Sequence, residues 1–102
     1  MPEAARKTDE ANHVPANGWS VHIINEGSPN VNINGLPAAR VGDKLQDHFL
    51  GILIHFPASR VPVISVGSST VFINGKAAAR KDDEVDCSSK ILEGSPNVNI
   101  GG

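Results

Sequence analysis

Apolar and polar positions alternate over short stretches that recur along the chain. Val31 and Ile33 alternate with asparagines, and the matching stretch at 71–74 is rich in β-branched residues. A period of two is typical of a half-buried strand. Both stretches lead into Asn-Gly, the dipeptide preferred in type I′ turns. Each therefore predicts a short β-hairpin, whereas nothing in the pattern indicates a long amphipathic helix.

The hairpin stretches belong to a longer unit that occurs almost three times. Residues 27–43 have the sequence GSPNVNINGLPAARVGD and residues 67–83 the sequence GSSTVFINGKAAARKDD, while residues 94–102 hold only the first half, GSPNVNIGG. Residues 4–13 align with 78–87 and supply the missing half. A chain whose two ends are halves of one repeat is expected to close into a pseudo-threefold object. We therefore expect one all-β domain spanning residues 1–102.

A further strand is expected before each Gly-Ser pair, at 21–26, 61–66 and 89–93. An isoleucine stands three residues before each of these glycines: Ile24, Ile64 and Ile91. We expect these isoleucines to form an inward-facing layer. Strand alternation then places the residues five and seven positions before the glycine on the same face, among them His22 and Cys87.

Aligning the repeats also brings potential metal ligands into register. His13 lies seven residues after one repeat arginine and Cys87 seven after another, and His48 lies eight after the third. Equivalent positions of a threefold scaffold converge on its axis, so these three side chains are predicted to bind one metal ion. Imidazole and thiolate ligands together favour zinc.

Two histidines are candidates for the fourth ligand. His22 has the inward parity described above, whereas His55 lies in the longest connection and could fold back over the axis. We favour His22 and keep His55 as the alternative. Four protein ligands close a zinc site, and closed sites are structural rather than catalytic. Such an ion can contribute on the order of 10 kcal/mol to folding.

The repeat arginines Arg6, Arg40 and Arg80 also recur in register. Each could fix a turn by hydrogen bonding to carbonyls or to a nearby aspartate, or could bind a ligand. We favour the turn role. The acidic run at 82–86 lacks the spacing of an EF-hand and is more typical of a solvated turn.

Composition narrows the function further. The formal net charge of the 102 residues is −2, so no nucleic-acid partner is expected. One cysteine allows no internal disulfide, and the N-terminal residues lack the pattern of a signal peptide. Neither a Gly-x-Ser-x-Gly elbow nor a phosphate-binding loop occurs in the sequence. Enzymatic activity is therefore not expected.

Residues 36–43, LPAARVGD, contain a literal Pro-Ala-Ala-Arg. With the flanking GSPNVNING, the chain resembles the PAAR-repeat proteins, the spike tips of bacterial type VI secretion systems and related contractile phage tails. The resemblance implies a small cone of short β-strands and hairpins with a structural zinc ion near its apex. Three histidines and one cysteine hold that ion in the family. Here the matching set is His13, His22 (or His55), His48 and Cys87.

The resemblance also implies a partner and a mechanical role. The wide base of such a cone caps a trimeric β-helical spike (VgrG or a phage central spike), one chain per trimer, and the sharpened tip aids piercing of a target envelope. Effector cargo is a further possible partner, and contact with the target membrane is transient. Such a protein is assembled in the bacterial cytoplasm and delivered outwards by the machine. The alternatives are a small zinc hydrolase and a metal-free β-prism that binds another protein.

Overall fold

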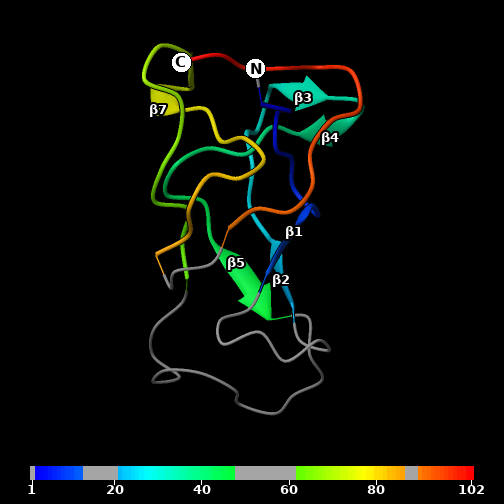
Figure 1. Ribbon diagram of the computed structural model, residues 1–102. Coiled ribbons are helices and arrows are strands. Elements are labelled where there is room, and N and C mark those ends of the chain that lie inside the picture. Colours follow the sequence, from blue (N-terminus) through cyan, green and yellow to red (C-terminus); the bar gives the residue numbers. More distant parts are fainter. Residues whose placement is uncertain (1, 13–20, 48–61, 87–89) are drawn as a thin grey trace.

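The computed structural model describes residues 2–12, 21–47, 62–86 and 90–102, and at residues 12, 21, 22, 46 and 47 it describes the backbone alone. The described residues contain no helix. Their strands are all short: β1 (Glu10–Asn12), β2 (Val21–Ile24), β3 (Asn32–Ile33), β4 (Leu36–Pro37), β5 (Leu45–Asp47), β6 (Phe72–Ile73) and β7 (Lys76–Ala77) (Figure 1). The all-β class expected from the sequence is confirmed.

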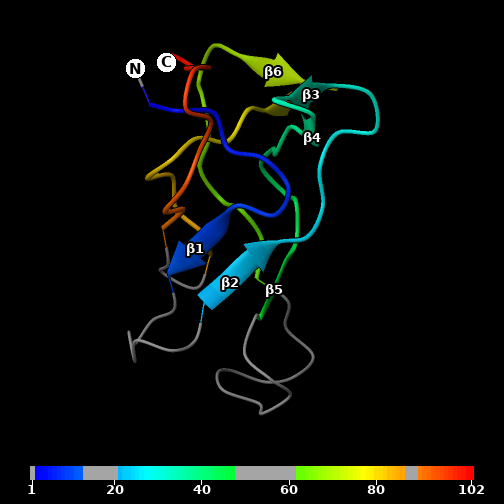
Figure 2. The same cartoon turned by 90° about the vertical axis from the view of Figure 1, so that its right-hand side faces the viewer.

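The strands form antiparallel pairs in three small sheets. β2 lies between β1 and β5, β3 pairs with β4, and β6 pairs with β7. The two hairpins and both ends of the chain lie at one end of the molecule, which we call the hairpin end (Figure 1). Seen after a 90° turn, β1 and β2 remain away from this end (Figure 2).

The repeats fold as three equivalent arms. The first arm is 21–47 and the second is 62–86, and the third is assembled from 90–102 and 2–12. In the third arm Ala4 N donates to Val98 O at 2.9 Å, which matches the bond from Ala38 N to Val31 O in the first arm. The two ends of the chain therefore complete one hairpin between them, as the divided repeat predicts.

A circle of backbone hydrogen bonds closes the three arms on one another. Ala39 N donates to Ala5 O, Ala5 N to Ala79 O, and Ala79 N to Ala39 O, each at 3.0 Å. All three alanines are at most 1% exposed. Because each arm donates to one neighbour and accepts from the other, the circle requires a closed pseudo-threefold arrangement, and the closure expected from the repeats is confirmed.

The core consists of two threefold clusters. The isoleucine layer of Ile24, Ile64 and Ile91 is fully buried, as predicted, and packs with the alanine circle. A second cluster, at the hairpin end, consists of Ala4, Ile33, Ala38, Ile73, Ala78 and Ile100. Threefold repetition thus lets the three arms bury their apolar side chains together in two layers.

The expected strands at 61–66 and 89–93 are wrong in extent. In those stretches the structure forms isolated bridges, Ile64 with Val85 and Ile91 with Ala11 among them. Each arm pairs with a different neighbour on either side, so a ladder ends after a few residues. Val31 is also more exposed than a half-buried strand predicts, at 37%, whereas Ile33 is buried.

Candidate functional site

Each repeat arginine is held by the aspartate three residues later in the chain. In the first arm Arg40 Nε donates to Asp43 Oδ2 at 3.0 Å and Arg40 Nη2 to Asp43 Oδ1 at 2.9 Å. The same pairing joins Arg6 to Asp9 and Arg80 to Asp83. This two-point contact fixes a turn, so the favoured turn role of the arginines is confirmed.

The turn between arginine and aspartate has the type II form. Asp43 N donates to Arg40 O at 3.0 Å, and Gly42 between them has a φ of +93°. The equivalent residues are Thr8, with a φ of +81°, and Asp82, with a φ of +75°. A positive φ at this position favours glycine, so the first arm has the least strained of the three turns.

The aspartate partner also affects the titration of the arginine. The hydrogen bond with Asp43 raises the pKa of Arg40 above its usual value, and the same cause raises the pKa of Arg6 and of Arg80. A raised pKa means that the stabilisation is complete below the unfolded-state pKa and is lost only when pH rises through the folded-state pKa. The arginines therefore remain charged throughout the neutral range.

Side chains at the hairpin turns connect neighbouring arms. Asn74, in the type I′ turn of the second arm, accepts hydrogen bonds at Oδ1 from Ser28 Oγ (2.6 Å) and Arg40 Nη1 (3.1 Å) of the first arm. Its Nδ2 donates to Asn30 Oδ1 at 2.9 Å. The turn of one arm thus fixes the arginine and serine of the next.

The same connection recurs around the molecule with different atoms. Asn34 of the first arm accepts from Arg6 Nη1 at 3.2 Å and donates to Asn97 Oδ1 at 2.9 Å, both in the third arm. In the third arm, where glycine replaces asparagine, Gly101 O accepts from Ser68 Oγ at 2.7 Å and from Arg80 Nη1 at 3.2 Å. Each arm is therefore bonded to the next in a complete circle.

The burial and the hydrogen bonds of the serine after each repeat glycine were not predicted from the sequence. Ser28, Ser68 and Ser95 are buried, and each hydroxyl accepts two backbone N–H groups of its own turn, as Ser28 Oγ does from Asn30 N and Val31 N. Their recurrence directly after each repeat glycine was the available signal. Burial of a small polar group that is fully hydrogen bonded fixes the turn without an unsatisfied donor.

At the hairpin end, each arm carries one buried isoleucine and one partly exposed valine. Ile33, Ile73 and Ile100 are 7–9% exposed there. One valine per arm lies two residues before each of them and, by strand alternation, on the same face: Val31, Val71 and Val98. These valines are exposed to nearly the same degree, 36–37%. We call the six residues the apolar base.

The predicted metal ligands are for the most part outside the described residues. This holds for His13, His48, His55 and Cys87, and for His22 the structure gives the backbone alone. In β2, His22 is paired with Ala11 on one side and with Asp47 on the other. Within the described ranges no group of His, Cys, Asp and Glu side chains could hold a metal ion. The zinc site therefore stays a prediction.

The residues that directly precede three of the predicted ligands are held by backbone pairing. Asn12 and Asp47, the residues before His13 and His48, are paired with neighbouring residues of β2. Asp86, the residue before Cys87, donates its N–H to Val63 O at 2.9 Å. β1 and β5, which end at Asn12 and Asp47, lie away from the hairpin end (Figure 1).

A single chain folded as three equivalent β-arms around a pseudo-threefold axis is a threefold β-repeat protein. Residues 57–102 match the family model described as PAAR motif. This match confirms the resemblance to the PAAR-repeat proteins over that part of the chain, and the first arm has the same turns and closures. A search of curated proteins gives no significant match. In the described part of the chain, no helix could cross a membrane.

Proposed function

We propose that the protein caps the trimeric β-helical spike of a contractile injection machine and forms its piercing tip. The observation that carries this proposal is the threefold apolar base, in which one valine and one isoleucine recur in each of three arms. A homotrimer presents the same surface three times, so a single chain can match it only by repeating its own contact residues. The PAAR motif supports the same role, because this family is one of structural spike-tip proteins.

The base is built to stay rigid under load. Its turns are bonded from arm to arm through Asn34, Asn74 and Gly101. The alanine circle joins the three arms to one another as well. A tip that is driven through an envelope benefits from such bonds because force applied to one arm is shared with the other two.

Variants of the base test this proposal. Changing Val31, Val71 and Val98 together to Asp should weaken binding to a trimeric β-helical spike fragment at least about tenfold, because charges would be desolvated at the centre of the contact. The three valines are exposed, so the fold should survive. The matched control is Val66→Glu, an exposed valine elsewhere whose equivalents, Glu26 and Glu93, are already glutamate. Unchanged binding by the triple variant would contradict the proposal.

We also propose that a structural zinc ion joins the three arms. Two core residues, Ala11 and Val85, are buried two positions before His13 and Cys87. The donor set of imidazoles and one thiolate suits zinc. When bound, the ion would cross-link segments that are distant in sequence. His22 is the preferred fourth ligand and His55 the alternative.

Metal removal tests the zinc proposal. Elemental analysis should give one zinc per chain, and a chelator should lower the unfolding temperature markedly because binding and folding are coupled. His22→Ala should lose zinc much more readily than His55→Ala, which serves as its control. Retention of full thermal stability after complete metal removal would contradict the structural role, and preferential loss in His55→Ala would identify the other histidine.

A further inference from the structure

The three seams between arms share one backbone arrangement. Where the first arm meets the second, Val41 N donates to Ala77 O at 2.8 Å. The equivalent bonds run from Lys7 N to Pro37 O and from Lys81 N to Glu3 O, also at 2.8 Å. The side chains at these seams, however, differ.

The seam between the first and second arms carries four apolar residues, Val41, Val66, Phe72 and Ala77, which we call the apolar strip. At Gly67 an added Cβ would lie 2.8 Å from Val41 Cγ2 and 3.1 Å from Ala77 Cβ, so these two side chains meet beside it. Ala77 is paired with Phe72, and paired residues of a hairpin have their side chains on the same face. Val66 directly precedes Gly67.

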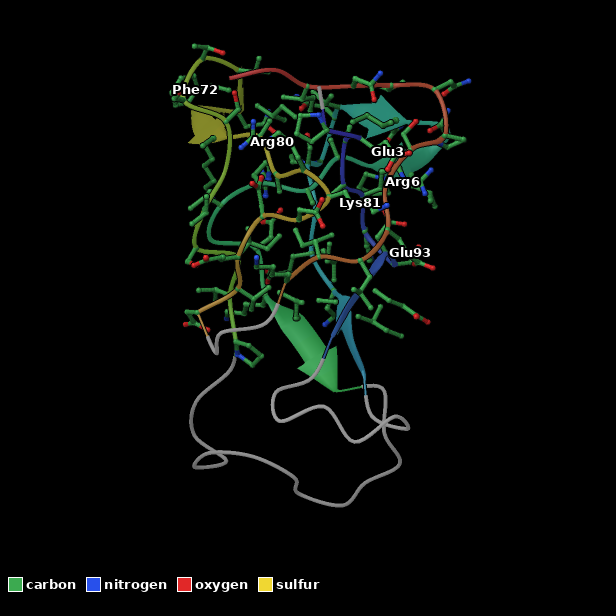
Figure 3. The ribbon with its side chains drawn as sticks, in the orientation of Figure 1. Glu3, Arg6, Phe72, Arg80, Lys81 and Glu93 are labelled. Atoms are coloured by element: carbon green, nitrogen blue, oxygen red, sulfur yellow. The ribbon has the colours of Figure 1, made fainter. Side chains whose placement is uncertain are left out.

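Two side chains of this apolar strip are strongly exposed, whereas Val41 and Ala77 are half-buried. The exposed fraction is 59% for Phe72 and 41% for Val66. Phe72 projects from the hairpin end on the opposite side of the molecule from Glu3 and Glu93 (Figure 3). It is one of only three phenylalanines in the chain. An exposed aromatic side chain with apolar neighbours is typical of a binding surface.

The equivalent positions at the other two seams are polar except for Pro37. In the order of the apolar strip they consist of Lys81, Glu93, Asn99 and Glu3 at one seam, and of Lys7, Glu26, Asn32 and Pro37 at the other. Their glutamates also take part in hydrogen bonds, since Glu26 Oε1 accepts from Lys44 N at 3.0 Å and Glu93 Oε1 from Glu10 N at 2.9 Å. Val66, at the equivalent position, has no side-chain oxygen that could accept such a hydrogen bond. The second arm thus gives up a hydrogen bond and gains an apolar surface.

Contact with a trimeric spike does not account for this difference. A homotrimer meets three arms in the same way, whereas the apolar strip exists on one seam. A second copy of this chain is also a poor occupant, because a stable protein interface needs about 20–30 residues a side and the strip has four. The small footprint suits a short extended segment with an apolar anchor.

We propose that the apolar strip docks one short polypeptide segment of a further protein, once per tip, with an apolar side chain seated against Phe72. The proposal rests on the proposed function, since it takes the spike to be threefold. The segment lies along the seam from Val41 to the β6–β7 hairpin and leaves the apolar base free. The threefold apolar base would then bind the spike, and the apolar strip, which occurs at one seam, would bind this partner.

Site-specific photocrosslinking tests the docking. The photoreactive residue benzoylphenylalanine is placed at Phe72, Asn32 or Asn99 of the full chain in injection particles from its own host. We expect position 72 to give an adduct with one polypeptide that is neither the spike nor this chain, at least about tenfold more than positions 32 and 99. Equal adducts at the three positions, adducts only with the spike or with this chain, or none would overturn the proposal.

A substitution separates docking from the proposed function. Phe72→Asn places in the second arm the residue that the other arms already carry, so it should fold normally. It should remove the crosslinked polypeptide from purified particles at least about tenfold while leaving the amount of this chain per spike unchanged. If the partner is retained, the strip is not its site. If this chain is absent from particles altogether, the spike-tip proposal itself fails.

Discussion

At the scale of single residues, the turn between each repeat arginine and its aspartate offers a natural comparison. The backbone is the same in the three arms, but the residue with positive φ is Thr8, Gly42 or Asp82. A β-branched residue is strongly disfavoured in that region of backbone space. The third arm therefore stores strain that the first arm avoids.

Thr8→Gly should relieve this strain. We expect the free energy of unfolding to rise by about 1 kcal/mol, because the strain released exceeds the greater entropy of glycine in the unfolded chain. Thr8 is exposed, so little packing is lost. Denaturant unfolding measures the change. The reciprocal Gly42→Thr should lower the free energy of unfolding by about 1–2 kcal/mol. If either variant were as stable as the parent, the turns would not be strained as described.

Residue-level predictions succeeded where the interaction is local. The pairing of Arg40 with Asp43 spans three residues, and the recurrence of both was visible in the repeats. The contact of Asn74 with Ser28 was not predictable, because it depends on which arm lies beside which. Likewise Gly101 takes the place of an asparagine by offering its carbonyl oxygen, which no residue pattern reveals.

At the scale of elements, the hairpins follow from their turns. Asn34-Gly35 and Asn74-Gly75 have positive φ at both residues, as a type I′ turn requires. The strands predicted before each Gly-Ser pair were too long, because periodicity gives the face of a residue but not the number of neighbours available to pair with it. The inward-facing Ile24, Ile64 and Ile91 were predicted correctly, because the face of a residue is what periodicity gives.

The third hairpin differs in being assembled from two chain ends. Gly102 has a φ of +80°, close to +81° at Gly35, and Ile100 N donates to Pro2 O at 2.9 Å. A circularly permuted chain should therefore fold if Gly102 is joined to residue 2, changed by Pro2→Leu to restore the turn N–H, and the chain is opened between Gly75 and Lys76.

The permuted chain should retain the fold, with a free energy of unfolding within about 1 kcal/mol of the parent, since one short closure replaces another. Circular dichroism and denaturant unfolding measure both. The matched control is opened instead between Ala39 and Arg40, where the alanine circle would be broken, and should not fold. Loss of structure in the first permutant would contradict the equivalence of the three arms.

At the scale of the whole molecule, sequence repetition was sufficient to predict closure but not surface chemistry. The divided repeat implied three arms, and the circle of Ala5, Ala39 and Ala79 provides the bond that closes them. The apolar base and the apolar strip became visible only once burial was known, because valine at 31 and phenylalanine at 72 have no fixed exposure in a strand pattern. The zinc ligands, which lie for the most part outside the described residues, remain a prediction.

The central claim is that one chain imitates a trimer in order to cap it. The most direct test is the native mass of the complex between this chain and a trimeric β-helical spike fragment, measured with this chain in excess. The account predicts one chain per trimer at saturation, however large the excess. A complex with three chains per trimer, or no complex at all, would contradict it.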